Sequence, residues 1–308
     1  MRENFRRRDG APHRLLVGPA KARPKGVDSL NDEPRARWSN SIVHSRKGFG
    51  FALGRAKPET APSDETVKLK GPMPSPLVIL NQEVISCTRC SRLIAHCRKV
   101  GQEKRRAYMD WEYWAKPVPG WGDPDARLLI LGLAPGAHGS NRTGRPFTGD
   151  GSGNFMYPIL HKAGFASQPT ATHRDDGMRL KDAYITAAVR CAPPQNKPTP
   201  EEIANCSNYL DRELALLKKV RVVVVLGRIG FDAYLNYLKR GGVITSRAGL
   251  AFGHGARYEM ANGHILLCSY HPSMQNTLTG KLTEKMFLKI FTEARKLIEG
   301  RTGRSSNS

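Results

Sequence analysis

The residues between positions 132 and 153 have the types and spacing of a ligand-binding loop. The segment GLAPGAHGSNRTGRPFTGDGSG holds seven glycines, two arginines and one histidine, and Asp150 is its only carboxylate. Glycines let a backbone approach a ligand closely, and successive N–H groups in such a loop form a concavity for an anion or a carbonyl oxygen. Asp150 could activate a water molecule or stabilise a developing cation. Its alternative role is to cap a helix that begins near Gly151.

Other polar residues near this loop are candidates for contacts with a substrate. Within the loop, the candidates are Gly136, Ala137, His138 and Asn141, whose backbone or side chain can face the concavity. No Lys–Ser/Thr pair follows the glycines, which disfavours a loop for nucleoside triphosphates. A second polar segment, SYHPSMQNTLTG at 269–280, follows an apolar run, and its candidates for contacts with a phosphate backbone are Ser273, Gln275 and Asn276.

The cysteines have the spacing of a metal or cluster site. The chain has six of them: Cys87, Cys90, Cys97, Cys191, Cys206 and Cys268. The first two form C-x2-C, and Cys191 and Cys206 form C-x14-C, so two distant segments supply four thiolates, which suit either zinc or an iron–sulfur cluster. Disulfides would need secretion, and nothing in the sequence argues for it. Cys97 is a second-choice ligand, and Cys268 is predicted to be a core residue.

The elements that must position these residues alternate between strands and helices. Apolar runs predict strands at 127–134, 182–191, 221–227 and 264–273, and periodic patterns predict helices at 76–100, 154–165, 199–219, 228–242 and 282–300. Thr199, Pro200 and Glu202 form a helix start. This order predicts an α/β three-layer sandwich with a central, largely parallel four-stranded sheet that is covered on both faces. Its ligand site should lie beyond the carboxyl ends of the strands, where both polar segments fall.

The composition indicates a polyanionic partner. The formal net charge is +22, with 49 Lys and Arg against 27 Asp and Glu. Such an excess favours nucleic acid, although an arginine-rich lineage could also produce it. No apolar run is long enough to span a membrane. We predict a basic, disordered extension at 1–75, a catalytic domain at 76–300 and a disordered tail at 301–308, in a cytoplasmic protein.

Four segments together resemble the uracil-DNA glycosylase superfamily, in particular its iron–sulfur family 5. They are CTRC (87–90), GLAPGAHGSNRTGRPFTGD (132–150), RCAPPQNKPTPEEIANC (190–206) and SYHPSMQNTLTG (269–280). The resemblance implies a monomeric enzyme that removes uracil, and also other deaminated bases such as hypoxanthine, from double-stranded DNA. It also implies a [4Fe–4S] cluster held by four thiolates: Cys87, Cys90, Cys191 and Cys206.

The resemblance also implies roles for individual side chains. Phe147, in the PFTG segment, would stack on the flipped base, and a place in the core is its alternative. His271, in the HPS tip, would meet the carbonyl oxygen of the departing base, and Asp150 would be the catalytic carboxylate. Family 4 relatives have Glu where this chain has Leu133, and Asn where it has Ala187. Asn196 is the candidate to replace that asparagine in part.

Two other functions remain alternatives at this stage. One is a non-catalytic iron–sulfur protein that binds DNA with the same fold. The other is a zinc-bearing hydrolase acting on a nucleotide, which no HExxH or histidine-rich ligand set supports. The presence together of Asp150, Phe147 and His271 favours the enzyme over the first of these.

Overall fold

The structure, a computed structural model, describes residues 74–300. The predicted tail at 301–308 lies outside this range, and so does the predicted extension at 1–75 apart from its last two residues. The helices are α1 (Pro76–Ile85), α2 (Ser91–Glu103), η1 (Arg106–Tyr108), α3 (Ser140–Thr143), α4 (Gly151–Lys162), η2 (Pro194–Asn196), α5 (Pro200–Leu216), α6 (Arg228–Arg240), α7 (Met274–Leu278) and α8 (Glu284–Gly300). The strands are β1 (Trp121–Gly122), β2 (Leu128–Gly132), β3 (Ala183–Ala187), β4 (Val222–Leu226), β5 (Arg257–Glu259) and β6 (Ile265–Ser269).

A single mixed sheet forms the centre of the described part of the chain. Its strand order is β1-β3-β2-β4-β6-β5. The four inner strands are parallel, which confirms the predicted parallel core, whereas β1 and β5 pair antiparallel at the two edges. The predicted number of four strands is therefore wrong, because the sheet has two further short strands at its edges. They have two and three residues, too few to show an apolar pattern.

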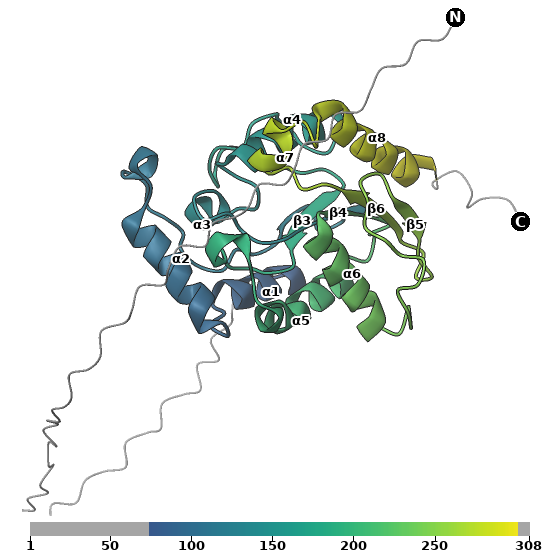
Figure 1. The fold of residues 1–308 in the computed structure, drawn as a ribbon, viewed down its shortest axis with the longest axis horizontal. Helices are drawn as coiled ribbons and strands as arrows, with labels where there is room; N and C mark the ends of the chain where they lie inside the picture. Colours follow the sequence, from purple (N-terminus) through teal and green to yellow (C-terminus); the bar gives the residue numbers. More distant parts are fainter. Residues whose placement is uncertain (1–73, 301–308) are drawn as a thin grey trace, which may run out of the picture. The chain divides into compact units, whose positions relative to one another are not determined.

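The inner strands are buried on both faces because successive side chains point to opposite sides of the sheet. In β2, Leu128 and Ile130 belong to the core that α4 and α8 cover, while Leu129 and Leu131 face α5 and α6. Figure 1 shows this arrangement, with α4 and α8 on one side of the strands and α1, α5 and α6 on the other. The three-layer sandwich is thereby confirmed.

Local sequence signals explain where the main helices begin and end. Thr199 and Glu202 form a reciprocal capping box at the start of α5, and Pro200 occupies the first turn. The predicted helix over 76–100 is instead two helices, because the Cys87–Cys90 segment forms a turn between α1 and α2. None of the helices in the described part of the chain has the length and apolar character to cross a membrane.

Candidate active site

A cavity of about 670 Å³ lies at the carboxyl ends of β2 and β3. Its walls come from the loop between β2 and α4, from the end of β3 and the turn after it, and from the segment after β6. Most of the predicted site residues line it: Gly136, Ala137, His138, Phe147, Asp150, Asn196, His271, Ser273 and Gln275. The topology explains this convergence, since parallel strands bring all their following loops to one edge of the sheet.

The two other residues predicted to contact the substrate, Asn141 and Asn276, do not line the cavity. Asn141 is fully buried, and its Nδ2 donates to the carbonyl oxygens of Cys97 (3.3 Å) and Ala137 (3.4 Å). Nδ2 of Asn276 donates to the carbonyl oxygen of His271 at 2.8 Å. Both side chains hold backbone that carries lining residues, and neither lines the cavity itself.

Asp150 has one of the two roles that the sequence leaves open, the helix cap, and its second carboxyl oxygen lies against the glycine loop. Its Oδ1 accepts a hydrogen bond from N of Gly153 at 2.9 Å, which caps α4. Its Oδ2 lies against the glycine loop, since a Cβ added to Gly136 would stand 2.9 Å from this oxygen. Burial raises the pKa of Asp150, and hydrogen bonds from Gly153 and Ser152 and the charge of Arg142 only partly oppose it. The carboxyl group is thus a stronger base than an exposed aspartate.

His271 follows the end of β6 and lines the same cavity. Burial lowers the pKa of its imidazole to about 4, so the ring is neutral at pH 7. A neutral imidazole carries one N–H donor and one acceptor nitrogen. The ring centroid lies 5.8 Å from that of Phe147, and the two planes are inclined by 33°. The two side chains therefore form neighbouring parts of one wall.

Phe147 holds an unusual backbone conformation for a bulky residue. Its φ is +51°, in the left-handed region, which costs ~1–3 kcal/mol and persists only where surrounding contacts enforce it. N of Phe147 donates to Oγ of Ser140 at 3.0 Å. Gly153 lets the first turn of α4 approach closely, since a Cβ there would overlap the carbonyl group of Phe147. The chain thus maintains a strained turn at the residue predicted to stack on a base.

His138 has a partner that sequence reasoning missed. The hydroxyl group of Tyr113, which is buried, lies 3.0 Å from Nδ1 of His138. Burial lowers the pKa of His138, and so do the charges of Arg105 and Arg142, so this ring is also neutral at pH 7. If the hydroxyl group donates, His138 carries its proton on Nε2. The aromatic-rich run at 108–114 was the available signal for Tyr113.

Arg142 is a second residue that sequence reasoning missed. Its side chain is buried, and its guanidinium group lies 3.9 Å from the ring centroids of both Tyr108 and Trp111. Nε donates to the carbonyl oxygen of His138 at 2.8 Å, and Nη2 donates to that of Gly149 at 2.6 Å. Arg142 thereby ties the middle of the loop between β2 and α4, at His138, to its end at Gly149.

A buried ion pair supports the wall at the end of β3. Arg190 lines the cavity, and its guanidinium group pairs with Glu213 of α5, with both side chains at most 2% exposed. Oγ1 of Thr186 donates to the same carboxylate oxygen at 2.6 Å. Ala187, which pairs with Gly132 in the register of β3 and β2, completes this wall.

The predicted cluster cysteines lie in two buried apolar groups. Cys191 and Cys206 share one group with Leu93 and Cys97, and Cys90 packs against it, while Cys87 packs beside Tyr209 in the second group. Burial raises the pKa of Cys90 and of Cys206, and the charges of Cys87 and Cys90 add to the rise at Cys206. Within residues 74–300, no group of three or more His, Cys, Asp or Glu is placed to hold a metal ion.

Comparison with known proteins identifies the family of this chain. A family model described as the uracil DNA glycosylase superfamily matches residues 119–295. A type-5 uracil-DNA glycosylase of Thermus thermophilus is 53% identical over 216 residues, covering 70% of this chain and 95% of that protein. One of Pyrobaculum aerophilum is 43% identical over 211 residues, covering 68% and 88%. A type-4 uracil-DNA glycosylase of Sulfurisphaera tokodaii is 29% identical over 215 residues, covering 68% and 81%.

The fold and the cavity define an α/β protein with a candidate ligand site at the carboxyl ends of its parallel strands. With the family match, the chain belongs to the uracil-DNA glycosylase superfamily, and within it to the type-5 group. The family membership predicted from the four sequence segments is therefore confirmed.

Proposed function

We propose that this protein is a DNA repair glycosylase that hydrolyses the bond between uracil and deoxyribose and leaves an abasic site. The observation that carries the proposal is the convergence of Asp150, His271 and Phe147 on one cavity. Relatives named uracil-DNA glycosylases match most of the described chain at high identity, which supports the same substrate.

The cavity has the groups that base excision requires. A base must leave the duplex to reach it, at a cost of a few kcal/mol that stacking and polar contacts recover. Phe147 offers a stacking surface inside the cavity, and backbone N–H groups of 134–139 offer donors for a carbonyl oxygen. The neutral imidazole of His271 donates its N–H to an oxygen of the leaving base as negative charge develops there.

Asp150 acts on the positive charge that develops on the sugar. As the bond from C1′ to the base breaks, its electrons go to the base and the sugar becomes cation-like. The ionised carboxylate stabilises this cation and accepts a proton from the water whose oxygen bonds to C1′. The base leaves as an anion and takes up a proton afterwards. Burial raises the pKa of Asp150, so it accepts this proton more readily than an exposed aspartate would.

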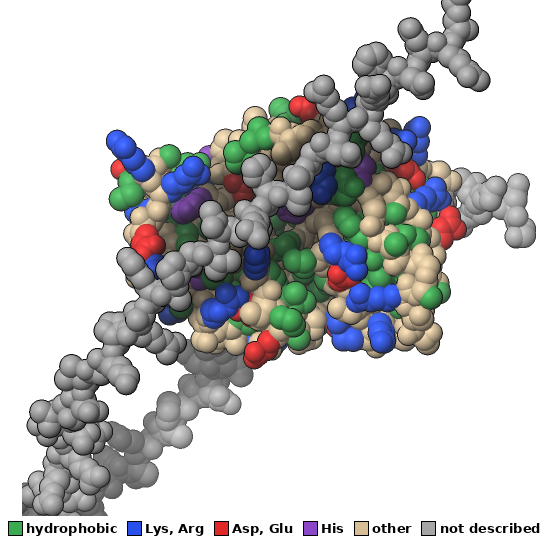
Figure 2. All heavy atoms as spheres, viewed as in Figure 1, with side chains coloured by type: hydrophobic (Ala, Val, Ile, Leu, Met, Phe, Trp, Pro, Cys, Tyr) green, Lys and Arg blue, Asp and Glu red, His purple; other side chains and the backbone are tan. Residues whose placement is uncertain are grey.

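Double-stranded DNA is the proposed partner, and a monomer is the proposed working unit. Residues 76–308 carry 33 Lys and Arg against 19 Asp and Glu. Figure 2 shows Lys and Arg side chains scattered over one face of the molecule, both at its margin and nearer its middle. Such charges bind phosphates without reading sequence. An enzyme that acts on chromosomal DNA would work at the nucleoid in the cytoplasm of a prokaryote.

A [4Fe–4S] cluster is the proposed cofactor, with Cys87, Cys90, Cys191 and Cys206 as its ligands. The chemistry of the four thiols supports this donor set, since they come from two distant segments and lie in neighbouring apolar groups, although residues 74–300 do not place three or more of them around one metal ion. Nδ2 of Asn205 lies 3.6 Å from Sγ of Cys90 and can donate to a thiolate there. When bound, the cluster would cross-link the two segments through iron–sulfur bonds.

The proposed function is tested with the purified protein and a duplex that carries one uracil opposite guanine. We expect an abasic site, seen as strand cleavage after alkali, and release of free uracil. Absence of both from an iron-loaded preparation would refute the proposal and favour a DNA-binding protein without catalysis. A duplex with thymine in place of uracil is the control for specificity.

The base preference should depend on Ala187. An asparagine at this wall could pair with the edge of uracil, and its polar atoms would go unpaired against other bases. With Ala187 that penalty is absent, so we expect uracil and hypoxanthine to be excised at rates within about two orders of magnitude, under ~3 kcal/mol. Ala187→Asn should widen the gap, mainly by slowing removal of hypoxanthine.

Single-turnover excision from matched duplexes by both variants measures this effect. Ala188→Ser, one residue further on and outside the cavity lining, is the control for a nearby polar substitution. An unchanged ratio of the two rates in Ala187→Asn would show that base preference is set elsewhere, and Asn196 would be the next residue to replace.

A further inference from the structure

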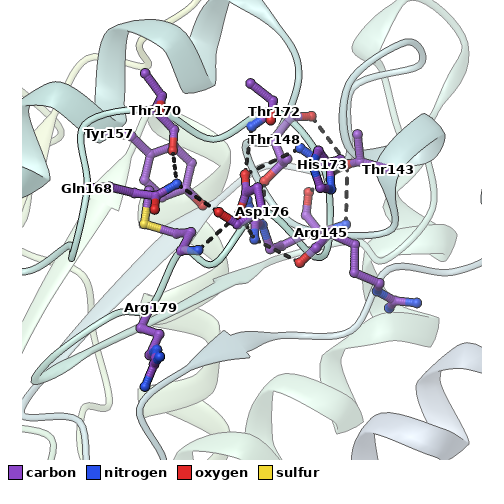
Figure 3. A network of polar contacts seen from close by, with 12 residues as sticks. Thr143, Arg145, Thr148, Tyr157, Gln168, Thr170, Thr172, His173, Asp176 and Arg179 are labelled. Carbon is purple, nitrogen blue, oxygen red and sulfur yellow. Dashed lines mark hydrogen bonds and ion pairs between the residues drawn. The ribbon is translucent and has the colours of Figure 1, made fainter.

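Arg145, in the RPFTGD segment, is held by a partner from outside the loop between β2 and α4. Nη1 of Arg145 donates to Oδ1 of Asp176 at 2.8 Å, and Nη2 donates to Oδ2 at 2.7 Å, so the two side chains form a two-pronged ion pair. The side chains are 2% and 6% exposed. Figure 3 shows the pair at the centre of a polar network that joins the loop to the segment containing Gln168–Arg179.

Asp176 itself is fixed by its own backbone surroundings. Oδ2 accepts from N of Thr172 at 2.8 Å and from N of His173 at 3.3 Å, and Oδ1 accepts from N of Met178 at 3.1 Å. Burial opposes ionisation of this carboxyl, but the hydrogen bonds from Arg145 and the backbone outweigh it and hold its pKa well below the ordinary range. Asp176 is therefore a fixed anion against which Arg145 is oriented.

The network continues from Arg145 to both neighbours of Phe147. Nε of Arg145 donates to Oγ1 of Thr148 at 2.9 Å, and this hydroxyl group donates to the carbonyl oxygen of Pro146 at 3.1 Å. The hydroxyl group of Tyr157 donates to the same carbonyl oxygen at 3.0 Å. Positions 146 and 148 are thus held on either side of the left-handed turn at Phe147.

We propose that Asp176 is a positioning residue for base excision, which acts through Arg145 and Thr148 to keep Phe147 in its left-handed conformation with the ring in the cavity. This inference rests on the proposed function. Without the fixed anion, Arg145 loses both of its bonds to the carboxylate, which help to orient Nε toward Thr148, and the turn can relax to a negative φ. The ring of Phe147 would then leave the position from which it can stack on a base.

The test compares four proteins in single-turnover excision of uracil from a duplex with one uracil opposite guanine. They are the wild type, Asp176→Asn, Phe147→Ala and the double variant. In Asp176→Asn the amide presents N–H donors to the donors of Arg145, so we expect excision to slow about 10-fold or more. Added to Phe147→Ala, the same substitution should slow excision less than about twofold, because the ring through which it acts is gone.

Asp175→Asn is the matched control. Asp175 is exposed and directly precedes Asp176, and its substitution should leave the rate within about twofold of the wild type. A second measurement is affinity for a duplex that carries a tetrahydrofuran abasic analogue, which offers no base to stack. Asp176→Asn should bind this duplex within about twofold of the wild type, since phosphate contacts supply that affinity.

An unchanged rate in Asp176→Asn, or an equal slowing with and without Phe147, would overturn the inference. If Asp176→Asn does not fold, Thr148→Val replaces it in the same four-protein comparison, because it removes the hydroxyl group that accepts from Arg145 and keeps the side-chain volume. An unchanged rate in Thr148→Val, or an equal slowing with and without Phe147, would then overturn the inference. A wild type that releases no uracil would instead refute the proposed function, so the two failures are distinguishable.

Discussion

Replacement of Asp150 by Asn should slow uracil excision by about 10²-fold or more, the scale of losing one group that acts on the transition state. Asn is as good a helix N-cap as Asp, so α4 should keep its start and the protein its stability. The amide cannot accept a proton from water, and it carries no charge to stabilise the sugar cation. Single-turnover excision from a uracil duplex, together with the melting temperature, measures both expectations.

Asp150→Ala separates the chemistry from the cap. This variant loses the hydrogen bond to N of Gly153 as well as the carboxylate, which should cost about 0.5–2 kcal/mol of stability. We expect the Ala and Asn variants to be slowed to a similar extent and to differ in melting temperature. If Asp150→Asn excises uracil within about twofold of the wild-type rate, Asp150 is only a cap, and catalysis rests on the loop and the substrate.

The pH dependence of the wild type should come from the same carboxyl group. The ionised form of Asp150 is the active one, so the rate should rise with pH through a pKa that burial has raised above the ordinary aspartate value. The imidazole of His271, with its pKa lowered to about 4, is neutral at pH 7 and adds no change of rate with pH near neutrality. The excision rate of Asp150→Asn should not change with pH over this range. If its rate still rises with pH, another group titrates.

Replacement of Cys206 by Ser should remove the iron and most of the soluble protein. Cys206 lies at the buried face of α5, and Cys191 reaches the same apolar group from the end of β3. Loss of one thiolate would free the two segments that the proposed cluster would join and expose the apolar group to water. Visible absorbance and iron content measure the loss, and we expect about four irons per wild-type chain.

Cys268 and Cys97 provide the controls for ligand choice. Cys268 is buried in β6, where burial raises the pKa of its thiol to about 12, and Cys268→Ser should keep the iron. Cys97 packs beside Cys191, and the Cys97→Ser variant should also keep the iron. Iron lost from Cys97→Ser but kept in Cys206→Ser would contradict the ligand set. A colourless, zinc-containing and active wild type would contradict the cluster itself.

The sequence predicts the inner sheet well because burial on both faces leaves a continuous apolar run. Val222–Leu226 is such a run, and its limits in the structure lie within one residue of the predicted ones. The edge strand Arg257–Glu259 could not be read in this way, because its half-exposed residues follow no apolar pattern. The turn at Cys87–Cys90 was missed since its residues also fit a helix period.

The residues of the candidate site also differ in whether the sequence could predict them. Asp150 and His271 were accessible to sequence reasoning because they stand in segments whose residue types are unusual for a core or a linker. Tyr113 and Asp176 were not, because they contact partners that lie 25 and 31 residues away in the chain, respectively. A tyrosine or an aspartate outside a motif has many ordinary uses, and only the folded arrangement shows which partner it meets.

The close approach of the glycine loop to Asp150 limits how this enzyme can vary over evolution. A Cβ at Gly139 would overlap the carboxyl group of Asp150, which is tied down by its bond to α4, so even alanine would displace the group proposed to act on water. Ala187 faces open cavity instead and can exchange for other small or polar residues. Related enzymes should therefore acquire new base preferences at the end of β3, while the glycine at 139 stays the same.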